Sequence, residues 1–327
     1  MDLALRGLGC QWELRRSGET SIGLWRIRVS DSAAGGKGAL ARRKPLPKRL
    51  VIIPGFGDTS LGWIAESALL RPALKRAGYD EVVVFDLPGF HGFLSEEKCF
   101  QSFDDFFAAA SDALDSLRPH AVFGHSLGGW IAGDYAASCG EGKRPAAGAG
   151  GYAGPELLVV MNPSGAYGAR AEIEGFKTLF NSAIEQGFHK LRPHVFRAEP
   201  LWFRLFAREF GDFVQRPDVV QFMRSLDERH LVQDRLANVR GKAWVIWGEN
   251  DTLTPAVWVD AWLDRLTHPE VTARGVLLPG VGHSPHMESP AITAALLSQI
   301  LLGKEPHRVG KRWWKLVLPH SPAPIAV

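Results

Sequence analysis

A serine bracketed by glycines constrains this chain more than any other feature of its sequence. Gly124-His125-Ser126-Leu127-Gly128 follows a short apolar run, 120–123, and leads into Gly129-Trp130-Ile131-Ala132, a helix-like continuation. A serine at such a point sits on a strained strand-to-helix turn, so the residues two before and two after it must be small. Gly124 and Gly128 meet that need. The sequence therefore predicts a nucleophile elbow, a turn that presents a serine hydroxyl at the edge of a sheet.

The segments around this elbow alternate between strand-like and helix-like patterns. Apolar runs occur near Leu50, at 82–85 and at 157–161, and helical patterns cover 63–76 and 102–117. Such alternation predicts a mostly parallel central sheet with helices on both faces. Residues 12–29 read as an N-terminal hairpin with a turn near Ser17-Gly18.

An acidic residue is expected after the elbow, because this architecture orders its catalytic groups as serine, acid and histidine. The strand-like run 243–247 ends in Gly248-Glu249-Asn250-Asp251, and Pro255 then suits the opening turn of a helix. We expect Asp251 to be the acid, with Glu249 as the weaker alternative. A plain helix N-terminal carboxylate is the other interpretation of Asp251.

The histidine is expected later still, on a loop that follows another strand. Residues 275–283 read as a strand and a Gly-rich loop ending in His283, which of the eleven histidines is the one placed after a late strand beyond the acid. His283 is therefore the expected general base, and the nearby His286 is the alternative. His91, in the loop after an earlier strand, could line the site.

An oxyanion hole needs two backbone N–H groups, one from the residue after the nucleophile and one from the loop after an early central strand. Leu127 supplies the first. The run 50–53 leads into Pro54-Gly55-Phe56-Gly57, where the flanking glycines allow the Phe56 amide to turn toward the serine. Phe56 is the expected second donor.

Taken together, these motifs resemble those of the α/β-hydrolase superfamily. They are Pro54-Gly55-Phe56-Gly57, Asp86-Leu87-Pro88-Gly89, Gly124-His125-Ser126-Leu127-Gly128-Gly129, Gly248-Glu249-Asn250-Asp251 and Gly282-His283-Ser284-Pro285. The resemblance implies the α/β-hydrolase fold, a triad of Ser126, Asp251 and His283, and Phe56 and Leu127 as oxyanion donors. Many relatives carry a histidine where this chain has Pro54. Serine at the elbow argues against the dehalogenases and epoxide hydrolases of this fold, which use aspartate.

The stretch 164–240 interrupts the alternation and reads as several helices rich in phenylalanine, which predicts an inserted helical cap over the serine. The expected organisation is then a hydrolase core at 1–163 and 241–302, the cap at 164–240, and a tail at 303–327. The cap aromatics must pack the helices onto the sheet, and some should wall an apolar pocket. Substrate contacts are expected from four residues: Gly55, His125, Trp202 and Phe203. Trp130 is expected in the core.

The tail carries five basic residues around Trp313-Trp314 against Glu305 alone. This composition is compatible with contact to an anionic membrane surface, but a strand or arm packed back on the domain is the interpretation we favour.

Composition excludes several other classes of protein. A net charge of +3 is too mild to indicate nucleic-acid binding, and no window reaches the length of a transmembrane span. Cys10, Cys99 and Cys139 are few and widely spaced, which predicts reduced thiols in a cytoplasmic protein and no zinc site. The first sixteen residues lack the pattern of a signal peptide. No metal or organic cofactor is implied, and the oligomeric state is left open.

The expected activity is hydrolysis of a small or medium-chain carboxylic ester, a small-molecule substrate, through an acyl-enzyme. Two alternatives remain: a carbon–carbon bond hydrolase of ring-cleavage products with the same triad, and a non-catalytic relative that uses the pocket to bind a ligand.

Overall fold

A single twisted sheet runs through the molecule. The computed structural model describes residues 10–17, 20–29, 46–88, 98–144, 152–167, 170–205, 207–306 and 315–317. Within them the sheet has nine strands in the order β1-β2-β4-β3-β5-β6-β7-β8-β9. The strands are β1 (Cys10–Ser17), β2 (Thr20–Arg28), β3 (Arg49–Ile53), β4 (Glu81–Asp86), β5 (Ala121–His125), β6 (Leu157–Met161), β7 (Gly241–Gly248), β8 (Val271–Leu278) and β9 (Lys315–Val317).

The six strands from β4 to β8 in the sheet order pair in parallel, and β1, β2 and β9 pair antiparallel at the edges. The predicted N-terminal hairpin is present, with Ser17 opposite Thr20. Lys315–Val317 lies along β8, as expected of a strand that packs back on the domain.

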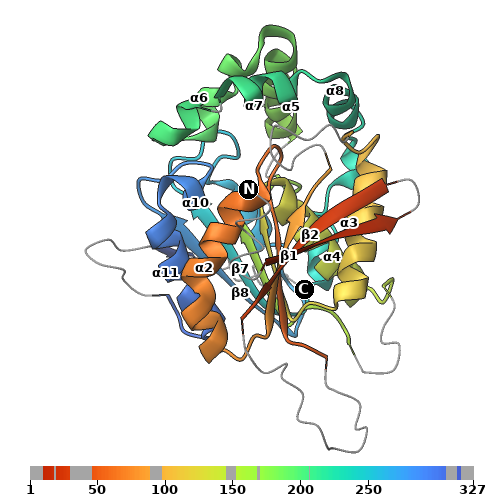
Figure 1. Cartoon of the computed structure of the whole chain (residues 1–327), viewed down its shortest axis with the longest axis vertical. Helices are drawn as coiled ribbons and strands as arrows, with labels where there is room; N and C mark the ends of the chain where they lie inside the picture. The colour runs from red at the N-terminus through yellow and green to blue at the C-terminus, as the bar shows by residue number, and fades with distance from the viewer. Residues whose placement is uncertain are drawn as a thin grey trace, which may run out of the picture.

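Helices cover both faces of the sheet, so its central strands are buried on both sides. The helices of this layer are α2 (Ser60–Arg76), α3 (Phe103–Leu117), α4 (Leu127–Gly140), α9 (Trp258–Leu263), α10 (Pro285–Glu288) and α11 (Pro290–Leu301). In Figure 1, α2, α10 and α11 lie on one side and α3 and α4 on the other. Successive residues of β3 serve the two faces: Leu50 and Ile52 join the core under α2 and α11, and Val51 and Ile53 join the core under α3 and α4. The predicted mostly parallel sheet with helices on both faces is confirmed.

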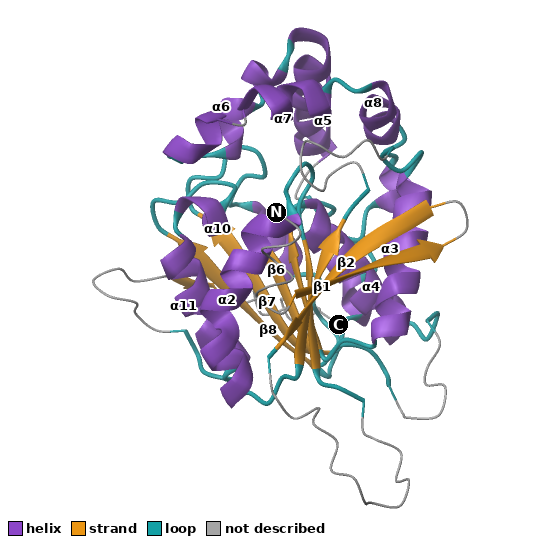
Figure 2. Ribbon diagram, in the orientation of Figure 1, coloured by secondary structure: helices purple, strands orange, loops and turns teal. Residues whose placement is uncertain are grey.

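The helices between β6 and β7 form a separate group, which we call the inserted segment. It comprises α5 (Arg170–Gln186), η1 (Phe188–Lys190), α6 (Arg192–Val195), η2 (Leu201–Leu205), α7 (Ala207–Val214), α8 (Pro217–Arg224), η3 (Glu228–His230) and η4 (Leu236–Asn238). Helices α5 to α8 gather at one end of the molecule, above the sheet (Figure 2). This is the stretch in which the sequence predicts a cap.

Two details differ from the sequence expectation or fall outside it. The helix after the acid strand begins at Trp258, not at Pro255, because the Asp251 carboxylate accepts the N–H groups of Leu253 and Thr254 and holds the chain in a turn. His91 lies outside the described residues. Across the residues with a described structure, no helix is both long enough and apolar enough to span a bilayer.

Candidate active site

Ser126 occupies a strained turn between β5 and α4. Its backbone adopts φ 52° and ψ −117°, a conformation that side-chain-bearing residues rarely take. The turn is possible because a Cβ at Gly124 would overlap the Gly128 carbonyl, and a Cβ at Gly128 would overlap the Ile53 carbonyl. The Ser126 N–H donates to the Met161 carbonyl at 2.9 Å, which ties the turn to β6. The local geometry is that of the predicted elbow.

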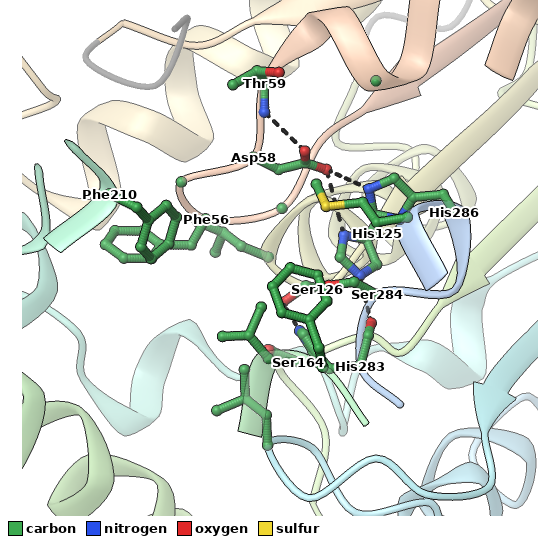
Figure 3. Close-up of a pocket in the computed structure, with 18 of the residues that line it drawn as sticks. Phe56, Asp58, Thr59, His125, Ser126, Ser164, Phe210, His283, Ser284 and His286 are labelled. Atoms are coloured by element: carbon green, nitrogen blue, oxygen red, sulfur yellow. Dashed lines mark hydrogen bonds and ion pairs between the residues drawn. The ribbon is translucent and has the colours of Figure 1, made fainter. Parts of the chain in front are cut away.

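Three side chains from the loops after β5, β7 and β8 meet in a line. His283 Nε2 lies 3.0 Å from Ser126 Oγ (Figure 3), and His283 Nδ1 lies 2.8 Å from Asp251 Oδ2. All three side chains are buried. The carboxylate in contact with the imidazole is that of Asp251 and not the alternative Glu249. This arrangement can pass the serine proton to the imidazole while the carboxylate holds the ring orientation.

Asp251 is held by donors that the sequence interpretation did not identify. Asn162 Nδ2 and Thr254 Oγ1 donate to Asp251 Oδ2 at 2.6 and 2.7 Å, and the N–H groups of Leu253 and Thr254 donate to Oδ1. Burial alone would raise the pKa of Asp251, but His283 and these hydrogen bonds outweigh it and keep the pKa below its usual value. The carboxylate therefore stays ionised at neutral pH. The sequence did contain a signal for Asn162, because it is a polar residue directly after a buried strand.

The loop after β3 lies directly against the elbow. A Cβ at Gly55 would lie 2.9 Å from His125 Nδ1 and 3.1 Å from Ser126 Cβ, so only glycine allows this approach. Gly57 has φ +69° and leaves no room for a Cβ beside the Phe210 ring. The Phe56 ring packs between the inserted segment's Phe180 and Phe213, with centroids 5.8 and 5.5 Å away. The loop that carries the expected oxyanion donor is thus fixed from both sides.

Leu127, the other expected donor, opens α4. The first N–H groups of a helix have no carbonyl partner within it, so they are free to face a developing negative charge. An anion next to Ser126 would lie at this helix terminus.

A second buried cluster lies beside the first and joins Asp58, His125 and His286 (Figure 3). Asp58 Oδ2 lies 3.0 Å from His286 Nε2 and 3.7 Å from His125 Nδ1, and it accepts the Trp63 indole N–H at 2.6 Å. His286, the alternative base, is therefore engaged with Asp58 and stacks on Trp63 at 4.0 Å. The sequence interpretation did not identify Asp58 or Trp63.

The protonation of this cluster follows from its contacts. His125 Nε2 lies 2.8 Å from the His283 carbonyl, which can only accept, so this nitrogen carries the hydrogen. Burial lowers the pKa of His125 to about 4, so its ring is neutral at neutral pH. Burial raises the pKa of Asp58, but the adjacent His286 and His125 outweigh it and hold Asp58 ionised. His125, expected to contact substrate, thus also supports the backbone of the His283 loop.

The donor set of this cluster could hold a metal ion. One carboxylate oxygen and two imidazole nitrogens lie within 4.8 Å of one another, and His125 Nδ1 has no hydrogen-bond partner. A cation there would share Asp58 Oδ2 with the Trp63 N–H, which already points at that oxygen. The Asp58 carboxylate is therefore already engaged by the Trp63 indole and by the ion pair with His286.

A cavity of about 650 Å³ opens over Ser126 and His283. Of the residues expected to contact substrate, Gly55, His125 and Phe203 line it, whereas the side chain of Trp202 lies outside the described residues. Trp130 is buried as expected and also reaches the cavity wall. The inserted segment contributes further apolar side chains to the wall: Phe176, Phe180, Leu191, Val195, Phe196, Phe210, Met223 and Leu226. Among the described residues that line the cavity, none is Lys or Arg.

One acidic residue of the wall is unusual. Glu66, on α2, is 2% exposed, and its Oε1 has no hydrogen-bond partner. Burial raises the pKa of Glu66 to about 8, so the side chain is mostly uncharged at neutral pH. Because the protonated carboxyl group of Glu66 carries no charge, it leaves the cavity wall largely apolar.

Comparison with known proteins agrees with this geometry. A family model described as "Alpha/beta hydrolase family" matches residues 50–296. A 2-hydroxy-6-oxononadienedioate/2-hydroxy-6-oxononatrienedioate hydrolase of Burkholderia vietnamiensis is 30% identical over 222 residues, which cover 63% of this chain and 72% of that protein. A similar hydrolase of Paraburkholderia phymatum is 29% identical over 246 residues, 70% of this chain and 76% of that protein.

Solved structures share the fold at low sequence identity. A bacterial membrane phospholipase A superposes with a TM-score of 0.64 and 21% identity, covering 92% of this chain and 89% of the other. A carboxylesterase of Bacillus subtilis superposes with a TM-score of 0.61 and 14% identity, covering 93% and 96%.

Proposed function

Because the chain belongs to the alpha/beta hydrolase family, we propose that it is a serine hydrolase that cleaves a carboxylic ester with an apolar acyl chain of small or medium length. The observation that carries this proposal is the line of Ser126, His283 and Asp251 at the floor of an apolar cavity. The cavity holds the acyl chain, and the line of side chains supplies the nucleophile.

The proposed reaction has two halves. Ser126 Oγ attacks the ester carbonyl while His283 Nε2 takes its proton, and Asp251 stabilises the resulting imidazolium. The carbonyl oxygen becomes an oxyanion that accepts hydrogen bonds from the backbone N–H groups of Leu127 and Phe56. His283 returns the proton to the departing alcohol, which leaves an acyl-enzyme. A water molecule, deprotonated by His283, then releases the carboxylic acid and regenerates Ser126.

Carbon–carbon bond hydrolysis of ring-cleavage products is the second candidate. Both relatives named above are called 2-hydroxy-6-oxononadienedioate/2-hydroxy-6-oxononatrienedioate hydrolases. The compounds in those names bear two carboxylates. The described cavity wall has no Lys or Arg to pair with them, and it contains the acidic residues Asp58 and Glu209 beside the mostly uncharged Glu66. Placing a carboxylate in such a cavity without a cation is costly. The charge of the wall therefore favours an uncharged acyl chain.

The test compares wild type with Ser126→Ala on p-nitrophenyl esters of increasing acyl length, with a fluorophosphonate probe on both. We expect turnover with an optimum at small to medium length, and loss of both turnover and labelling in Ser126→Ala, whose circular dichroism should match wild type. Unchanged activity in the pure variant would overturn the role of Ser126. Labelling without ester turnover would favour carbon–carbon hydrolysis, and absence of labelling would favour a ligand-binding protein.

A further inference from the structure

One part of the inserted segment, Phe188–Arg208, carries an excess of positive charge, and we call it the basic strip. It holds five basic residues against a single acidic one, Glu199, whereas the entire chain has a net charge of only +3. The basic residues are Lys190, Arg192, Arg197, Arg204 and Arg208. All of these except the half-buried Arg192 are exposed. The strip therefore has a local excess of positive charge, as the tail at 303–327 also has.

The same strip displays leucines to solvent. Leu201 and Leu205, at the two ends of η2, are 76% and 75% exposed, which makes them the most exposed large hydrophobic residues in the described part of the chain. Phe203, between them, is buried and lines the cavity. The short helix η2 therefore exposes Leu201 and Leu205 to solvent, while Phe203 between them lines the cavity.

Other residues of the strip also belong to the cavity wall. Leu191, Val195 and Phe196 line it from the η1–α6 side. Glu199 is engaged inside the strip, with its carboxylate 2.5 Å from Arg192 and 3.5 Å from Arg204. The strip therefore exposes two leucines beside basic side chains, while its apolar residues on the other side line the cavity.

We propose that the basic strip docks the protein on an anionic lipid surface, with Leu201 and Leu205 entering the headgroup region and the exposed basic side chains contacting lipid phosphates. Apolar side chains flanked by cations are the combination that binds at such an interface. The proposal rests on the proposed ester hydrolase function, because it adds that the ester substrate is a lipid taken up beside the docked strip.

The observations favour a lipid surface over other occupants. A second copy docked through the same strip would bring two sets of cations together, which repel. Two separated leucines also make a poor hydrophobic centre for a protein interface, which needs a contiguous buried patch. If a second copy or another protein occupied the strip, binding to vesicles would not depend on the charge of the lipid.

The experiment measures cosedimentation with vesicles of phosphatidylcholine alone and with about 30 mol % phosphatidylglycerol, at low and high salt. We expect at least ~10-fold tighter binding to the anionic vesicles, weakened by salt. The double variant Leu201→Asp/Leu205→Asp should lose at least ~10-fold in binding. Val257→Asp is the matched control, since Val257 is 63% exposed but lies outside the strip, and it should bind as wild type does.

Two further readouts separate this proposal from the proposed function. Turnover of a soluble p-nitrophenyl ester should be the same in the double variant and in wild type, which also shows that the variant is folded. Ser126→Ala should bind vesicles normally even without turnover. Equal binding to the two kinds of vesicle, or binding unchanged in the double variant, would overturn the docking surface while leaving the hydrolase proposal intact.

Discussion

Asp251 shows how a fully buried carboxylate is kept ionised at the site. Its two oxygens accept hydrogen bonds from Asn162, Thr254 and the backbone of Leu253 in addition to the contact with His283. These donors replace the water that burial removes. Asn162 has an unusual backbone φ of 47°, and its side-chain amide donates to Asp251 in the loop after β7. The acid is therefore positioned by its neighbours as firmly as it positions the imidazole.

Exchanging this carboxylate for an amide tests the assignment. Asp251→Asn should lower kcat on a soluble ester by about 10⁴-fold, because the amide favours the wrong imidazole tautomer. Steady-state kinetics of the purified variant measure the effect, and Glu249→Gln is the control, expected to stay near wild type. A mild loss in Asp251→Asn together with a severe loss in Glu249→Gln would reverse the assignment.

Glu66 gives the protein a predictable pH dependence of stability. Its folded pKa of about 8 exceeds the ordinary value of 4.5, so between these values the folded state holds a proton that the unfolded state has released. The free energy of unfolding must fall as pH rises through this window, by on the order of 1.4 kcal/mol per pH unit for this one group.

The variant Glu66→Gln should remove that penalty. Its Tm relative to wild type should rise steadily between about pH 5 and about pH 8, as differential scanning fluorimetry can measure. Glu209→Gln is the control, because Glu209 also lines the cavity but is exposed. A constant Tm difference for Glu66→Gln across this range would mean that Glu66 is ionised in the folded protein.

At the scale of elements, Asp58 connects three segments that must be aligned for the proposed reaction. It lies on the loop between β3 and α2 and contacts His125 at the elbow and His286 on α10. His125 in turn donates to the His283 carbonyl after β8. The loop of the expected oxyanion donor, the nucleophile and the base are thus joined through one buried carboxylate.

Removing this carboxylate should loosen all three segments. Asp58→Ala leaves the Trp63 N–H and His286 without their acceptor and should cost about 3 kcal/mol of unfolding free energy, as measured by urea denaturation. Trp63→Phe removes only one donor and should cost less, about 1 kcal/mol beyond packing. If both variants were as stable as wild type, the cluster would have no structural role.

The sequence predicts some elements closely and misses others for a physical reason. The strand 157–161 and the helix from Ser102 match β6 and α3, because apolar runs and an N-cap serine are local signals. The elbow is also a local signal, because its two glycines, Gly124 and Gly128, lie within five consecutive residues. Asp58 and Trp63 were missed, and His286 was considered only as an alternative base, because their contacts arise only when α2 and α10 pack side by side, which spacing along the chain does not encode.

At the scale of the whole molecule, β9 closes one edge of the sheet. Lys315–Val317 pairs with residues 275–277 of β8. In the sheet, β8 lies next to β7, the strand that precedes Asp251. Without β9, β8 becomes an open edge strand with unpaired backbone groups, which promotes association between chains.

A chain truncated after Pro306 should therefore have a lower Tm and should show increased light scattering on storage, whereas a chain truncated after Leu318 retains β9 and should behave as the full chain does. Thermal melts and static light scattering of the three proteins measure this. Equal scattering from all of them would show that β9 does not protect the edge.

The inserted segment leaves the sheet after β6 and returns at β7, so it adds residues without altering strand order or register. Ser126, Asp251 and His283 all lie at the ends of strands, whereas much of the cavity wall belongs to the insert. The two parts still touch where the Phe56 ring packs between Phe180 and Phe213 of the insert. Under the proposed function, substitutions in the insert away from these contacts should alter which acyl chain fits, while the three proposed catalytic side chains keep their positions. One contiguous stretch of sequence could then be engineered to diversify the substrate range.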